Sequence, residues 1–169
     1  AWAEQAKVTA QTHIEYVDAP FKNVIAEIPQ RYHDIWTAAK GFYKTEPAVA
    51  DGGETILYAP HITTVSEAHP EIYEIGYHCR DYFTAQWERF KHIHWGVLAH
   101  STHLRGQGTY DATSGAERLR VRVTLATQIP REVCESINLG YLDPTTVDLD
   151  ALAAEPGTVV IPNAGEVLY

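Results

Sequence analysis

The chain has 169 residues, of which 45% are apolar and 21% are charged, and its formal net charge is −9. This length and composition predict a single globular domain over residues 1–169, which can bury a core without a disulfide or a structural metal. The acidic balance argues against a nucleic-acid partner, and no apolar run approaches the ~20 residues that a membrane helix needs. The two distant cysteines, Cys79 and Cys134, favour a cytoplasmic protein.

Strands and helices alternate along the chain. In chain order we expect a strand over 23–28, a helix over 34–44, a turn over 51–53, a strand over 54–59, a helix opening at 66, a helix over 80–90, a strand over 94–100, a strand over 118–126, a helix opening at 130, a helix over 146–154 and a strand over 158–161. Asp34 is the expected N-cap of the helix over 34–44, because its carboxylate can accept the free amides of the first turn. This interleaving of strands and helices predicts an α/β layered fold.

The run from Arg118 to Ala126 alternates charged and apolar residues. Side chains alternate between the two faces of a strand, so the apolar residues of this run face a core and the arginines face away from it. A strand with one charged face predicts a mixed β-sheet flanked by helices. Arg105 and the three arginines of this run are expected to pair with carboxylates, within the chain or across a domain interface, rather than to bind substrate.

Four of the nine histidines, His92, His94, His100 and His103, fall within twelve residues. Neutral imidazole is the commonest metal ligand in proteins, so this cluster is a candidate metal site. The spacing matches no known metal motif, and it favours histidines that are hydrogen-bonded in strand-end loops or at an interface. No nucleophile or phosphate-binding motif is present, so we assign no metal ligand and no catalytic residue to the chain.

Trp36, Thr37 and Lys40 share one face of the expected helix over 34–44. An ammonium group beside a hydroxyl and an indole could bind a carboxylate, because a hydrogen bond to a charged group is worth roughly 1.5–3 kcal/mol. The same spacing also fits a lysine that only complements the negative end of the helix.

Six stretches of the chain are similar to one known family: Ala26–Gly41, Val49–His61, Gly76–Phe83, Trp95–Gly106, Ile137–Pro144 and Ala164–Tyr169. They resemble the carboxy-terminal domain of the nickel-pincer lactate racemase family, and the later stretches resemble a lactate racemase-like subgroup of it. The resemblance covers nearly the whole chain. The chain begins Ala1-Trp2-Ala3 without methionine and ends directly after an apparent strand, which also predicts a segment of a longer polypeptide.

The resemblance implies a two-domain enzyme that racemises or epimerises a small 2-hydroxy acid. In this family a hydride moves from C2 of the substrate to a nickel-pincer nucleotide and back, and the amino-terminal domain carries the cofactor and the catalytic histidines. The chain is therefore expected to bind no cofactor, to be inactive alone, and to have the amino-terminal domain of the same polypeptide as its partner.

The family binds its substrate with a Gln-x-x-Lys pair, and the matching positions here are Thr37 and Lys40. The lysine is retained and the glutamine is replaced, so the shorter hydroxyl leaves room for a larger acid. A later Gln-Trp pair of the family matches Gln86 and Trp87. The resemblance thus implies substrate contacts at Lys40, Thr37, Trp36, Gln86 and Trp87.

Two alternatives of other classes stay open. The domain could bind a small anion or a partner without turnover. It could also be a metal hydrolase that uses the four clustered histidines.

Overall fold

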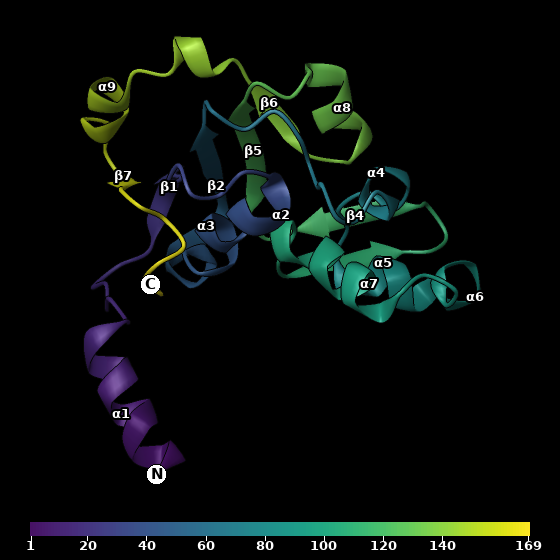
Figure 1. Cartoon of the computed structure of the whole chain (residues 1–169), viewed down its shortest axis with the longest axis horizontal. Helices are drawn as coiled ribbons and strands as arrows, with labels where there is room; N and C mark the ends of the chain where they lie inside the picture. Colours follow the sequence, from purple (N-terminus) through teal and green to yellow (C-terminus); the bar gives the residue numbers. More distant parts are fainter.

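The structure is a computed structural model that describes all of residues 1–169, and it contains two sheets (Figure 1). The main sheet is parallel, in the order β6-β5-β2-β1-β7, and a separate antiparallel hairpin pairs β3 with β4. The strands are β1 (Phe21–Glu27), β2 (Val49–Ala59), β3 (Gly108–Asp111), β4 (Ala116–Leu119), β5 (Arg122–Thr127), β6 (Gly140–Leu142) and β7 (Thr158–Ile161). The α-helices are α1 (Trp2–Thr12), α2 (Ile35–Ala38), α3 (Lys40–Tyr43), α4 (Glu71–Ile75), α5 (Arg80–Ala85), α6 (Trp87–Phe90), α7 (Trp95–Ser101), α8 (Arg131–Ser136) and α9 (Leu149–Ala153). Short 3-10 turns η1 (Glu46–Ala48), η2 (Thr102–Leu104) and η3 (Pro144–Thr146) complete the fold.

The predicted α/β layered class is confirmed. Parallel and antiparallel pairing both occur, as expected, but they occur in two sheets instead of one mixed sheet. The reason is that the alternating run from Arg118 to Ala126 is not one strand. It is interrupted at Arg120 and Val121, so that its first residues belong to β4 of the hairpin and its later residues form β5 of the main sheet. β5 buries Thr124 and Ala126 as well as Val123, which is typical of a parallel strand covered on both faces.

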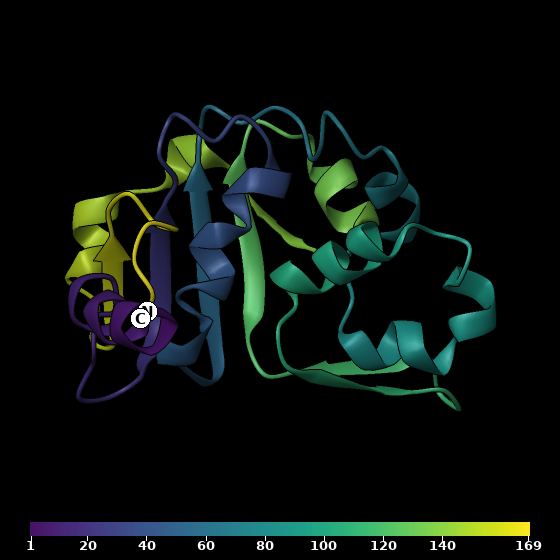
Figure 2. The same ribbon diagram turned by 60° about the horizontal axis from the view of Figure 1, so that its bottom comes forward.

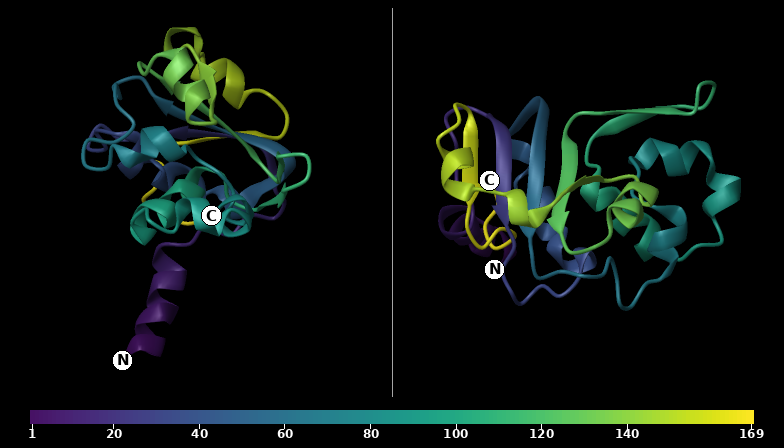
Figure 3. Two further views of the ribbon diagram at one scale, coloured as in Figure 1. Left: turned by 90° about the vertical axis from the view of Figure 1, so that its right-hand side faces the viewer. Right: turned by 90° about the horizontal axis from the view of Figure 1, so that it is seen from above.

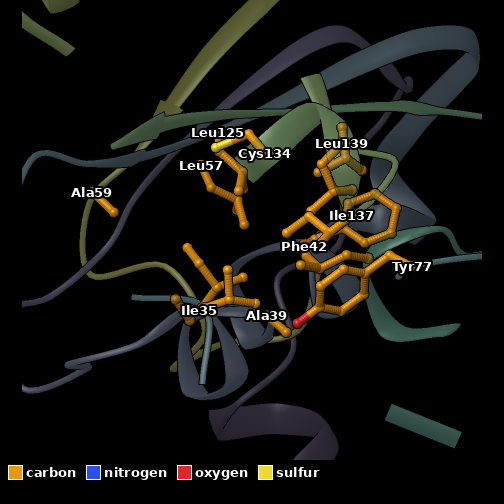
Figure 4. Packing of buried hydrophobic residues seen from close by; sticks show 14 of the residues in the cluster. Ile35, Ala39, Phe42, Leu57, Ala59, Tyr77, Leu125, Cys134, Ile137 and Leu139 are labelled. Carbon is orange, nitrogen blue, oxygen red and sulfur yellow. The ribbon is translucent and has the colours of Figure 1, made fainter. Parts of the chain in front are cut away.

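The expected helix over 34–44 is present as α2 and α3, which follow each other almost without interruption. Asp34 caps it as predicted, because its carboxylate accepts the amide of Thr37 at 2.9 Å. Ile35 and Phe42 are fully buried on the side of this helix that faces Leu57 of β2 (Figure 4). Burial of each such side chain contributes roughly 1.5–3 kcal/mol, so the apolar stripe fixes the helix on the sheet. Figure 2 shows α2 and α3 in front of the strands.

Three local predictions were wrong. The helix expected to open at Ser66 begins only at Glu71, and the Ser66 hydroxyl instead accepts the amide of His69 in the loop before it. Residues 94–100 were expected to be a strand, but they form most of α7. Its apolar run is too short for periodicity to separate a strand from a helix, and His94 starts the helix by accepting the amide of Gly96 on Nδ1 at 3.1 Å.

The expected turn over 51–53 lies inside β2. It forms a bulge there, since the pairing register with β1 shifts between Phe21 and Asn23. Gly53 is needed because a Cβ atom at this position would lie 2.5 Å from the carbonyl oxygen of Lys22. Gly53 therefore permits a close approach of β2 to β1.

Helix α1 was not predicted. It has no buried residue, and it extends away from the rest of the molecule (Figure 3). No helix of the chain has the length and apolar composition needed to cross a membrane.

Candidate functional site

Lys40 opens α3 and lies on the side of the helix away from the buried Phe42. Its side chain is half-buried, and its Nζ lies 5.0 Å from the centre of the Tyr32 ring. The ion pairs of the chain use other lysines and arginines, so Lys40 has no carboxylate within 4.0 Å. An ammonium group held against an aromatic face without a counter-ion is suited to receive an anion. We call Tyr32, Trp36, Thr37 and Lys40 the Lys40 surface.

Trp36 lies one turn before Lys40, between two histidines. Its ring stacks on His100 with a centroid distance of 3.5 Å and an interplanar angle of 5°, and it meets His69 at 4.2 Å and 31°. Nε2 of His100 also donates a hydrogen bond to the carbonyl oxygen of Trp36 at 2.8 Å. His100 therefore holds both the ring and the backbone of Trp36.

His100 is 7% exposed, and its Nδ1 is buried without a hydrogen-bond partner. Burial lowers the pKa of His100 to about 4, which outweighs the opposite effect of its bond to Trp36. His100 is thus neutral at physiological pH, with Nε2 as the protonated nitrogen.

The hydroxyl of Thr37 is already used within the helix. It donates to Oδ1 of Asp34 at 2.7 Å, and the same carboxylate caps the helix. The lone pairs of the Thr37 oxygen remain available as acceptors, but its proton is not free for a ligand.

Gln86 and Trp87 lie across α7 from the Lys40 surface. Trp95, Leu98, Ala99 and Thr102 share one face of α7 and its extension, and they line a cavity of about 410 Å³ together with Trp87. His100, on another face of α7, contacts Trp36 instead. Gln86 donates to the carbonyl oxygen of Tyr82 at 3.2 Å. The structure therefore brings Trp36, Thr37 and Lys40 together and leaves Gln86 and Trp87 elsewhere.

The four clustered histidines do not form one site. His92 and His94 are exposed, and His94 caps the start of α7. His100 and His103 lie at and just after the end of α7, with their ring centres 4.9 Å apart. Within residues 1–169, no group of three or more His, Cys, Asp or Glu side chains is arranged to hold a metal ion. This arrangement does not support the metal-hydrolase alternative.

The arginines that we expected to pair internally do so in part. Arg120 lies 3.5 Å from Glu46 and 3.3 Å from Asp51, and Arg122 lies 2.8 Å from Glu54. Arg120 thus holds the start of β5 against η1 and β2, Arg122 pairs with the neighbouring strand of the main sheet, and Arg118 has no carboxylate within 4.0 Å.

A polar network that the sequence did not indicate joins the hairpin to the loop before α5. Glu117 of β4 accepts hydrogen bonds from Nδ1 of His78 at 2.6 Å, from the amide of Cys79 at 2.8 Å and from Asn138 at 3.1 Å. Burial alone would raise the pKa of Glu117, but the bonds from His78 and Cys79 outweigh it and lower the pKa to about 2. His78 and Glu117 are 39 residues apart, so no local pattern could have revealed this contact. His100 and Trp36 are 64 residues apart and were missed for the same reason.

Comparison with known proteins gives two informative structural matches. The sequence matches no protein-family model and no curated protein. The crystal structure of a protein from Thermotoga maritima matches 99% of this chain with 35% identity and a TM-score of 0.91. The lactate racemase apoprotein from Thermoanaerobacterium thermosaccharolyticum matches 99% of it with 16% identity and a TM-score of 0.65. The chain spans 41% and 40% of these two proteins. Its fold is therefore that of a part of the lactate racemase apoprotein.

Proposed function

We propose that this chain is the substrate-binding part of a 2-hydroxy-acid racemase or epimerase related to lactate racemase. The observation that carries the proposal is Lys40, a half-buried ammonium group without a counter-ion in a chain that has 22 acidic residues. Such a group can bind the carboxylate of a substrate without first breaking an ion pair within the chain. The fold shared with lactate racemase apoprotein supports a 2-hydroxy acid as the source of that anion.

In the proposed complex, Lys40 binds the carboxylate of the substrate. The bond is charge-assisted and is worth roughly 1.5–3 kcal/mol. The rings of Tyr32 and Trp36 exclude water beside the charge pair, which strengthens it. Thr37 stands where the family resemblance has a glutamine, and its shorter side chain would leave room beside Lys40 for an acid larger than lactate. The proposal assigns substrate contact to Lys40, Thr37 and Trp36, and not to Gln86 and Trp87, because these lie across α7.

The family resemblance implies a nickel-pincer nucleotide, and residues 1–169 do not fit it. No set of three suitable ligands comes together on this chain to hold nickel. In our proposal the cofactor therefore belongs to an amino-terminal domain of the same, longer polypeptide, in the cytoplasm. The residues of this chain bind and orient the carboxylate of the substrate. We assign to them no step of the reaction at the cofactor.

The test uses the full-length polypeptide, loaded with its pincer cofactor, in heavy water with 2-hydroxy acids of increasing size. Optical configuration and the C2 proton signal are followed by NMR. We expect one acid to invert at C2 with little entry of deuterium, because the family returns the hydrogen internally.

Two outcomes would contradict the proposal. Full exchange of the C2 proton with solvent during inversion would show that the enzyme abstracts this hydrogen as a proton and does not return it as a hydride. No inversion of any acid, with the cofactor shown to be bound and with anion binding that depends on Lys40, would favour a small-anion-binding domain without turnover.

A further inference from the structure

Three cations gather around Tyr32 and the C-terminal segment. Nζ of Lys40 lies 5.0 Å from the centre of the Tyr32 ring, and Cζ of Arg31 lies 5.2 Å from the same centre. Lys44 follows Lys40 by one helical turn, and its Nζ donates to the carbonyl oxygen of Glu166 at 3.1 Å. The guanidinium of Arg31 lies 2.6 Å from the carboxylate of Glu166. We call Arg31, Lys40 and Lys44 the cationic cluster.

The cationic cluster is not neutralised within the chain. Its one ion pair joins Arg31 to Glu166, and neither Lys40 nor Lys44 has a carboxylate within 4.0 Å. This local excess of positive charge occurs in a chain that has 22 acidic and only 13 basic residues. Like charges that are held together repel one another, so a cluster of this kind favours the binding of an anion.

The parts of the fold that carry the cluster are held in place. Tyr32 is only 8% exposed, and its carbonyl oxygen accepts a hydrogen bond from Nε2 of His61 at 2.9 Å. Gly165 comes so close to α3 that a Cβ atom there would lie 2.8 Å from Cβ of Lys40. The C-terminal segment therefore passes directly beside α3 (Figure 1). The three cations consequently belong to one surface.

Arg31 can bind a second anion while it keeps its ion pair. Its side chain is 57% exposed, and one terminal nitrogen contacts Glu166. A guanidinium carries several N–H donors in a planar fork, so further donors remain for a carboxylate, which this fork binds in a bidentate manner. The pair with Glu166 is itself largely exposed, and its loss would cost little stability.

We propose that the Lys40 surface takes a 2-hydroxy acid that has a second carboxylate, with the C1 carboxylate on Lys40 and the second one on Arg31. The inference deepens the proposed function and rests on its assignment of Lys40. Both cations lie about 5 Å from the centre of one ring, so the two ends of a short dicarboxylate can reach them. Lys44 adds positive potential to the same surface and contacts no substrate atom in this arrangement.

The experiment measures the binding of two racemic acids to the full-length, cofactor-loaded polypeptide by titration calorimetry. 2-Hydroxybutanedioate and 2-hydroxybutanoate share the same carbon chain and differ in the second carboxylate. Racemic acids are used because inversion at C2 then causes no net reaction during the titration. Arg31→Gln removes the guanidinium. Arg80→Gln is the matched control, since Arg80 is also an exposed arginine that is paired with a single carboxylate, that of Asp81.

We expect the wild type to bind the dicarboxylate at least about tenfold more tightly than the monocarboxylate, because it forms one more charge-assisted hydrogen bond. Arg31→Gln is expected to reduce this preference to about twofold or less, while the affinity for the monocarboxylate stays within about twofold and shows that the Lys40 surface is intact. Arg80→Gln is expected to keep the preference. Glu166→Gln frees Arg31 from its ion pair and is expected to increase the preference.

Equal affinity of the wild type for the two acids would overturn the proposal. A preference that survives in Arg31→Gln, or that falls equally in Arg80→Gln, would also overturn it.

The failure of this inference and the failure of the proposed function give different results. Inversion of monocarboxylic acids without any preference for the dicarboxylate leaves the racemase assignment standing and shows that this inference is wrong. Binding of the dicarboxylate that depends on Arg31, without inversion of any acid, leaves the dicarboxylate site in place and contradicts only the racemase assignment.

Discussion

Replacement of Lys40 by methionine separates substrate binding from stability. Methionine keeps an unbranched apolar stem of similar length and removes only the charge. The structure sets the expected loss of stability. Lys40 has no carboxylate within 4.0 Å, and its Nζ lies 5.0 Å from the Tyr32 ring centre. Only a cation–π contact of about 0.5–1 kcal/mol is lost, so we expect the free energy of unfolding to change by less than about 1 kcal/mol.

The loss of affinity is expected to be larger. A charge-assisted hydrogen bond to the substrate carboxylate is worth roughly 1.5–3 kcal/mol, which corresponds to an increase in KM of about one to two orders of magnitude. The assay is the inversion of the accepted acid by the cofactor-loaded, full-length polypeptide. Lys22→Met is the control, because Lys22 is an exposed cation of β1 without an ion pair.

The two measurements together can refute the assignment. An unchanged KM in Lys40→Met, with the protein still folded, would remove Lys40 from the site. An equal rise of KM in Lys22→Met would show that the effect is one of net charge rather than of a contact.

Three further predictions concern stability. Burial lowers the pKa of His100 from 6.5 to about 4, so between these pH values only the unfolded chain binds the proton. The free energy of unfolding should therefore fall by up to about 3 kcal/mol as pH drops through this range. Urea titrations at several pH values should show a weaker dependence of this free energy on pH in His100→Gln than in the wild type. Glu117→Gln should destabilise the fold by about 2 kcal/mol at neutral pH, with faster amide exchange in the β3–β4 hairpin. This difference should shrink as pH falls from 4.5 towards 2, since in this range the unfolded wild-type chain binds a proton at Glu117 and the folded chain does not; a constant difference would contradict the lowered pKa of Glu117. Gly53→Ala should cost about 1–3 kcal/mol in thermal unfolding, because its Cβ atom would lie 2.5 Å from the backbone carbonyl oxygen of Lys22; an unchanged Tm would show that β2 can move away from β1 at no cost.

Local sequence signals were sufficient for most elements near the Lys40 surface. Pro29 ends β1 and Asp34 caps the next helix, and both features depend on neighbouring residues only. Helical spacing predicts a common face for Trp36, Thr37 and Lys40, which lie on the successive helices α2 and α3. The identification of Lys40 as a substrate contact, by contrast, came from a family resemblance and remains a proposal.

Contacts between distant residues decided what the sequence alone left open. The stretch 94–100 has apolar residues that suit either a strand or a helix, and burial of Val97 and Leu98 in the core selected the helix. The face that this helix turns to Trp36 separates His100 from Trp87, which no spacing along the chain predicts.

The alternating pattern of residues 118–126 determined that this run is extended, but not where it pairs. Tertiary structure split it at Arg120, since that guanidinium donates to the backbone oxygens of Val49 and Glu46 and so turns the chain from the hairpin into the main sheet. By itself the sequence determined the α/β class, the Asp34 cap and the helix of Lys40, because these depend on periodicity and on adjacent residues. Only the tertiary structure decided which histidine holds Trp36 and that Lys40 has no counter-ion, because these depend on groups that approach in space from distant parts of the chain.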